Sequence, residues 1–60
     1  MTAKQVIGKL EADGWTQIRQ RGSHRIFGHA DKLELVVVPD HGNRDLPAGT
    51  LASIKKEAGI

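Results

Sequence analysis

The segment Gly22-Ser23-His24 is the strongest candidate for chemistry in this 60-residue chain. Histidine ionises near neutral pH, so its ring can take or give a proton under ordinary conditions. Two basic residues flank the segment, Arg21 before it and Arg25 after it. A proton-transfer group among positive charges suits metal-free RNA cleavage, because RNA carries its own nucleophile, the 2′-hydroxyl.

Each residue of this constellation has a candidate role. His24 would act as general acid or general base. Basic side chains would stabilise the charge that develops on the phosphate, the candidates being Arg21, Arg25 and Lys32. A turn at Gly22 and Ser23 would also direct backbone N–H groups at a phosphate. The alternative is that the segment is only a turn and that the arginines form a solvated face.

A complete acid–base pair needs a second proton-transfer group, and His41 is the candidate. It follows Pro39 in a polar segment, 40–45, that predicts a loop. The alternative is an idle, solvent-exposed histidine. His29 lies beside an expected turn and is interpreted as structural or inert. The spacing of the three histidines matches no metal-binding pattern, and we expect neither a metal nor another cofactor.

The elements that must position these residues follow from local patterns. Thr2 and Gln5 form a capping-box pattern at the start of a helix that Gly14 would close. Its apolar residues recur at helical spacing: Ala3, Val6, Ile7 and Leu10. Three later segments are typical of strands, namely 15–21, 24–29 and 33–38. Gly22-Ser23 and 30–32 would form the turns between them, and Pro39 would end the third.

The C-terminal segment predicts a second helix over residues 47–58. Pro47 suits its first helical position, and Gly59 suits its C-cap. The expected core stripe consists of Ala48, Leu51, Ile54 and Ala58.

The order helix-strand-strand-strand-helix, with short connections, predicts an α+β fold. We expect one domain over residues 1–60, an antiparallel three-stranded sheet, both helices on one face, and the other face open to solvent or a partner. Alternation along 24–29 places His24 with Ile26 on one face and Phe27 on the other. We favour Phe27 pointing inward, which turns His24 to the open face; with Ile26 inward, His24 would lie at the edge of the core.

The composition of the chain limits which partners and which cellular location we expect. The chain carries nine Lys and Arg against seven Asp and Glu, a net charge of +2, which permits nucleic-acid binding without demanding it. It has no cysteine, no signal-peptide pattern and no run of membrane-spanning length, so we expect a cytoplasmic protein without disulfides. No glycine-rich loop links a strand to a helix, which argues against nucleotide-binding folds.

Four motifs in one order resemble the HicA (YcfA-like) family of small mRNA-interferase toxins across nearly the whole chain. They are Asp13-Gly14-Trp15, the run 19–24 ending in Gly22-Ser23-His24, Pro39-Asp40-His41-Gly42, and the run 46–51 that leads to Ile54 and residues 58–60. The resemblance implies a double-stranded-RNA-binding-domain-like α-β-β-β-α fold. It also implies a type II toxin, an endoribonuclease that cleaves mRNA and arrests translation, and that a cognate HicB-type antitoxin inhibits.

The family's catalytic histidine falls on His24, with Gly22 as the motif glycine beside it. One departure concerns the last helix, whose start at Pro47 lacks the lysine cluster with which double-stranded-RNA-binding domains grip phosphates. Single-stranded mRNA is therefore the expected substrate. Two alternatives stay open: a non-catalytic RNA-binding module that uses the same basic face, and an interaction protein that folds fully only with its partner. The oligomeric state of the free protein is also open.

Overall fold

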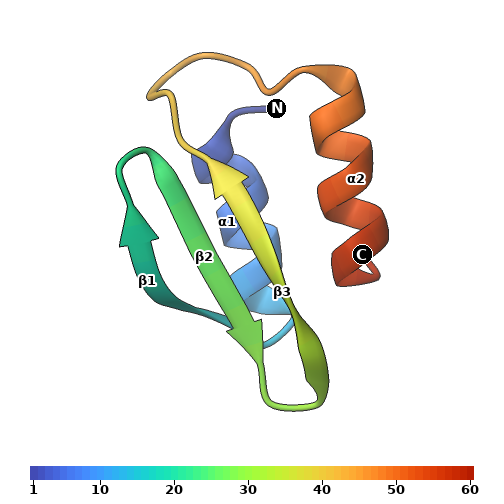
Figure 1. Ribbon diagram of the computed structural model, residues 1–60. Helices are drawn as coiled ribbons and strands as arrows, with labels where there is room; N and C mark the ends of the chain where they lie inside the picture. The colour runs from blue at the N-terminus through green and yellow to red at the C-terminus, as the bar shows by residue number, and fades with distance from the viewer.

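The structure is a computed structural model that describes residues 1–60. The chain forms two helices and a three-stranded sheet. Figure 1 shows that both helices lie against one face of the sheet. The elements are α1 Ala3–Ala12, β1 Trp15–Arg21, β2 His24–His29, β3 Lys32–Pro39 and α2 Ala48–Ala58. This order confirms the predicted α-β-β-β-α architecture, which is consistent with a double-stranded-RNA-binding-domain-like fold. Neither helix has the length and apolar character needed to cross a membrane.

Helix α1 begins at the predicted capping box. The Thr2 side chain accepts a hydrogen bond from the Gln5 backbone N–H at 3.3 Å, and the Gln5 side chain accepts one from the Thr2 backbone N–H at 2.8 Å. Two N–H groups that the helix itself cannot satisfy thereby gain partners. The helix ends at Asp13, after which Gly14 turns the chain with φ +97°.

The three strands form an antiparallel meander in the order β1-β2-β3. Strand β1 pairs with β2 from Trp15 opposite His29 to Arg21 opposite His24, and β2 pairs with β3 through Pro39 opposite His24. Each ladder contains one irregularity, between Gln17 and Arg19 in the first and between Phe27 and His29 in the second. The third strand is one residue longer at each end than predicted.

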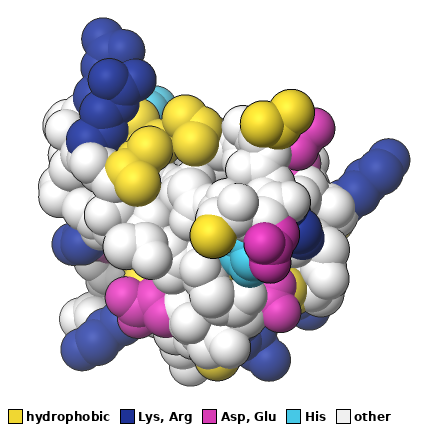
Figure 2. All heavy atoms as spheres, turned by 90° about the horizontal axis from the view of Figure 1, so that it is seen from below, with side chains coloured by type: hydrophobic (Ala, Val, Ile, Leu, Met, Phe, Trp, Pro, Cys, Tyr) yellow, Lys and Arg dark blue, Asp and Glu magenta, His cyan; other side chains and the backbone are white.

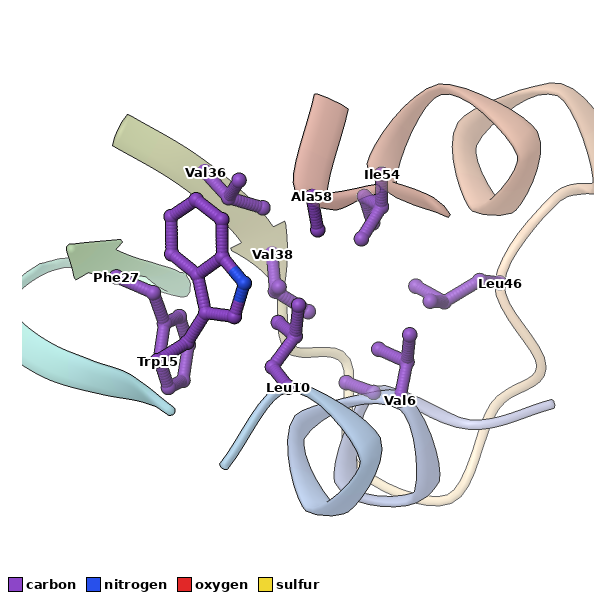
Figure 3. Packing of buried hydrophobic residues seen from close by; sticks show 10 residues of the cluster. Val6, Leu10, Trp15, Phe27, Val36, Val38, Leu46, Ile54 and Ala58 are labelled. Carbon is purple, nitrogen blue, oxygen red and sulfur yellow. The ribbon is translucent and has the colours of Figure 1, made fainter. Parts of the chain in front are cut away.

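The core lies between the sheet and the helices. Phe27 points inward and is fully buried, so the favoured strand orientation is confirmed. Figure 3 shows the Trp15 and Phe27 rings beside Val36, with Val6 and Leu10 of α1 facing the apolar side chains of β3 and α2. Ten residues form this cluster, which is small because a chain of this length has a large surface for its volume.

Two expectations about α2 are wrong. Pro47 is the N-cap rather than the first helical residue, with ψ 144° outside the helical range. Ala48 is exposed, whereas Ile54 and Ala58 are buried and Leu51 is half-buried. The top of the core is filled instead by Leu46, from the segment before the helix. Its backbone N–H donates to the carbonyl of Met1, so a tertiary contact with the N-terminus holds it in place.

The junction of α1 and β1 explains the Asp13-Gly14-Trp15 motif. The His29 ring contacts this junction: its Nε2 lies 2.9 Å from the Asp13 carbonyl, and its centroid lies 5.2 Å from that of Trp15 in an edge-on arrangement. A Cβ on Gly14 would lie 2.9 Å from the same Nε2 atom. Glycine is required here both for the positive φ and for the close approach of the ring.

Candidate active site

His24 is the first residue of β2 and is exposed. Because neighbouring residues of a strand point to opposite faces, its side chain leaves the sheet on the face away from the buried Phe27. No helix covers that face (Figure 1). The ring is therefore accessible from solvent, as the favoured strand orientation requires.

Arg21 lies directly across from His24 on β1, and Arg19 lies across from Ile26. Residues paired in this way share a face, with Cβ atoms roughly 5 Å apart. Simple alternation from the buried Trp15 would have placed both arginines on the helix side. The irregularity between Gln17 and Arg19 reverses the alternation and brings them to the histidine's side.

Arg19 was not among the residues singled out for the site, although it belongs to the basic run before the turn. No signal in the sequence marks a bulge at residues 17–19, because each of these residues is compatible with a regular strand. The register of β1 on β2 is what adds this second guanidinium to the surface around His24.

The turn before His24 is a two-residue hairpin loop formed by Gly22 and Ser23. Gly22 has φ +57°, which a side chain would strain, and it is the only residue of the turn with a positive φ. This is the pattern of a type II′ hairpin turn, which favours glycine at its first position. The Gln20 side chain donates to the Gly22 carbonyl at 2.9 Å and so braces the turn.

Arg25 does not share the histidine's face. It points to the helix side, where its Nε donates to Asp40 Oδ2 at 2.7 Å and its Nη1 donates to Gln17 Oε1 at 3.3 Å. Lys32 lies at the other end of the sheet, opposite His29, and its ammonium donates to the Ala58 carbonyl at 2.7 Å. Of the three candidate cations, only Arg21 is therefore paired with His24.

Asp40 connects three segments around the turn. Its backbone N–H donates to the Ser23 carbonyl at 2.7 Å, one carboxylate oxygen accepts from Arg25, and the other accepts from the Gly42 backbone N–H at 3.0 Å. The hydrogen bond from Gly42, followed by that from Arg25, lowers the pKa of Asp40 below its usual 3.8. The carboxylate is thus charged at neutral pH, and it anchors the loop that carries His41.

His41 is exposed and follows Asp40 in that loop. Its positive form also contributes to lowering the Asp40 pKa. Since Pro39 is paired with His24, the loop leaves the sheet next to the candidate histidine. The fold therefore brings His41 to the same end of the sheet as His24, although the two residues are far apart in sequence.

His29 has both ring nitrogens occupied. Its Nδ1 accepts from the Asp31 backbone N–H at 3.0 Å while Nε2 faces the Asp13 carbonyl. With Nδ1 as the acceptor, Nε2 is the nitrogen that donates to the Asp13 carbonyl, and both contacts hold the ring against the backbone. No three histidine or carboxylate side chains gather at one place in the chain.

Next to the basic residues, the open face carries exposed apolar side chains. Ile18, Leu35 and Val37 are each about half exposed, at 54%, 47% and 44%. Figure 2 shows exposed hydrophobic side chains gathered along one margin of the molecule beside projecting Lys or Arg side chains. We call the group formed by Ile18, Leu35 and Val37 the apolar patch. Single exposed hydrophobic residues are common, but a contiguous group suggests a contact surface.

Comparison with known proteins places this architecture in a family. The model of the HicA toxin family of bacterial toxin–antitoxin systems matches residues 3–60, nearly the whole chain. The chain belongs to the HicA toxin family. Membership gives it the role of a toxin and implies a cognate antitoxin as partner. A search of curated proteins gave no significant match. The HicA match spans both helices and all three strands, so it includes His24 and the turn before it.

Proposed function

We propose that this HicA-family toxin is an endoribonuclease that cleaves mRNA without a metal ion and so arrests translation. The observation that carries the proposal is the exposed His24 ring on an uncovered sheet face, directly across from Arg21. A free imidazole beside a guanidinium provides proton transfer and charge stabilisation at the same phosphate. The family match supports the same function.

The proposed reaction has two proton transfers. His24 takes the proton of the 2′-hydroxyl, whose oxygen attacks the adjacent phosphorus. The bond from phosphorus to the 5′-oxygen then breaks, and an acid gives a proton to that oxygen. The products are a 2′,3′-cyclic phosphate and a 5′-hydroxyl. His41 is the candidate for the second group, because the Asp40 loop holds it at the same end of the sheet.

The residues proposed to support His24 lie on two different faces of the sheet. Arg21, together with Arg19, supplies positive charge for the pentacoordinate phosphate. Gly22 and Ser23 form the tight turn that leaves His24 at the strand end and present backbone N–H groups nearby. Arg25 acts indirectly, since its guanidinium is engaged by Asp40. Its proposed contribution is to position the loop rather than to contact the reacting phosphate.

The antitoxin is proposed to cover the open face. The apolar patch lies beside Arg19, Arg21 and His24, so a HicB-type segment that combines acidic and apolar residues would match both parts of this surface. Such a segment would remove the histidine from solvent and block RNA at once. Action on mRNA also implies that the toxin works in the cytoplasm.

Cleavage of a single-stranded RNA oligonucleotide tests the proposal. His24→Ala should lower kcat by about 10²-fold or more, while RNA binding, followed by fluorescence anisotropy, persists. His41→Ala should also lower kcat if it is the second group. A single 2′-deoxy substitution at the cleavage site should abolish cleavage there, because the nucleophile is absent.

The profile of kcat/KM against pH from 5 to 9 should show an inflection near ~6–7 that the His24 variant loses. If the wild-type protein binds RNA but leaves it intact throughout this range, the alternative of a non-catalytic RNA-binding module is supported instead. Continued cleavage at a 2′-deoxy position would rule out attack by the 2′-hydroxyl.

A further inference from the structure

A groove of about 600 Å³ lies on the helix side of the sheet, behind the candidate active site. One wall is a stripe of α1 formed by Lys4, Ile7, Gly8 and Glu11, which share a helix face at spacings of three and four. The other wall is formed by Arg25 and the loop after β3, including Asp40 and Asn43. Its volume falls in the range of sites that bind small ligands.

Gly8 lines this groove without a side chain. It lies in the middle of α1, where glycine weakens a helix more than any residue except proline. Its φ is not positive, and a Cβ added there would meet no atom within 4 Å. Neither backbone geometry nor packing within the chain accounts for glycine at this position. The missing side chain leaves open space in the groove at this point of the helix.

The residues that line the groove indicate which chemical class of molecule could bind in it. Only one of the eight lining residues, Ile7, is hydrophobic. Lys4 and Arg25 are balanced by Glu11 and Asp40, so a phosphate would meet two carboxylates as well as two cations. A neutral group with hydrogen-bond donors and acceptors on its edge fits better. The Asn43 amide and the Glu11 carboxylate offer partners for such an edge, in the way that proteins recognise unpaired nucleobases.

The groove is connected to His24 through one strand. Arg25 is the next residue after His24, and its side chain leaves the opposite face of β2 to line the groove. Asp40, also in the lining, is hydrogen-bonded to Ser23 of the turn. A flexible single strand that crosses the sheet end at this turn passes from one site to the other.

We infer that this groove, between the Gly8 face of α1 and the Asp40–Asn43 loop, seats an unpaired nucleobase next to the phosphodiester at which His24 acts as a proton-transfer group. The inference rests on the proposed ribonuclease function and adds a base-recognition subsite to it. Asn43 and Glu11 read the edge of the base, and Gly8 leaves room for its ring. Cleavage-site preference is thereby determined on the face of the sheet opposite the histidine.

Filling the groove tests the inference. Gly8→Leu places a side chain in open space, so folding should be retained, as checked by thermal unfolding. Its KM for a single-stranded oligonucleotide should rise at least tenfold with little change in kcat. Gly49→Leu is the matched control: Gly49 is also helical with no atom within 4 Å of an added Cβ, but it lies outside the groove. Its KM should stay at the wild-type value.

A second variant tests base recognition. Asn43→Ala should reduce the preference among oligonucleotides that differ by one base beside the cleavage site, by at least threefold. Binding is measured in parallel with an oligonucleotide carrying a 2′-deoxy residue at that site, so the groove is tested even if the wild-type protein cleaves nothing. If Gly8→Leu binds and cleaves like the wild type, or Asn43→Ala keeps its full preference, the subsite is disproved while the ribonuclease function stands.

Discussion

At the scale of single residues, the two histidines of β2 show how environment assigns a role. His24 begins the strand on the uncovered face and is exposed. His29 ends the same strand with both ring nitrogens occupied by backbone groups. An imidazole whose nitrogens are both engaged has no free atom for proton transfer to a substrate. Only His24 therefore combines exposure with the neighbouring positive charge of Arg21.

The Gly14 position leads to a stability prediction. Gly14→Ala should lower the free energy of unfolding by at least ~1–2 kcal/mol, since alanine must adopt a positive φ and its Cβ would collide with the His29 ring. Urea unfolding followed by tryptophan fluorescence measures the loss. Gly22→Ala is the control, because its Cβ would meet no atom and only backbone strain remains. Equal losses in both variants would contradict the contact with His29.

Asp40 leads to a prediction about pH. A carboxyl whose pKa is lower in the folded protein than in the unfolded chain stabilises the fold while it is charged. That contribution is complete above the unfolded value, near 3.8, and is lost as pH falls through the lower folded value. Asp40→Asn should therefore be less stable than the wild type at pH 7. The difference in Tm should shrink below about pH 4.

Thermal unfolding of both proteins at pH 7, 5 and 3 measures this effect. Asp31→Asn is a suitable control, since Asp31 is exposed and contacts His29 only through its backbone. A difference in Tm between wild type and Asp40→Asn that stays constant across this range would show that Asp40 contributes no charge-dependent stability.

At the scale of elements, the short irregularity in β1 has the largest consequence for the site. It allows Trp15 and Gln17 to face the helices while Arg19 and Arg21 face outward with His24. Bulges commonly redirect side chains near functional sites, because one extra residue shifts the alternation of everything after it. Helix α1 plays a different part, since its outer face contributes Gly8 and its neighbours to the groove.

The start of α1 leads to a prediction at this scale. Thr2→Ala removes the acceptor for the Gln5 backbone N–H and should cost about 1 kcal/mol of stability. Thr2→Ser keeps the hydroxyl and should lose much less. Chemical denaturation of the three proteins distinguishes these outcomes. If Ala and Ser at this position are equally stable, the capping box contributes nothing measurable.

At the scale of the whole molecule, stability depends on a small core. Ten clustered residues join both helices to β2 and β3, and Leu46 closes the cluster from the segment before α2. A domain of about 60 residues has only a few kcal/mol of net stability. The loss of one large core side chain therefore removes much of what holds the molecule together.

Leu46→Ala should lower the free energy of unfolding by about 2–4 kcal/mol and leave a substantial unfolded population at 37 °C. Leu33→Ala is the control, because Leu33 is 98% exposed and its truncation should change stability by less than about 0.5 kcal/mol. Circular dichroism melts measure both. A cooperative melt of the isolated wild-type chain would also count against folding only with a partner.

Local patterns in the sequence were sufficient to predict the helices, the strands, the Gly22-Ser23 turn and the inward orientation of Phe27. Each depends on neighbours within a few residues: a capping box, alternation, or a residue that tolerates positive φ. The candidate histidine could be named for the same reason, because its turn and its strand position are local features.

Only the tertiary structure decided which side chains share a face with His24 and which line the groove behind it. A strand's register and its bulges depend on the pairing of distant segments, so local patterns could not show that Arg21 lies across from His24 or that Arg25 is bound by Asp40. Leu46, Asp40 and Gly8 likewise acquire their surroundings from chain segments that are distant in sequence. Local propensity acts over a few residues, whereas a site is made where separate elements meet.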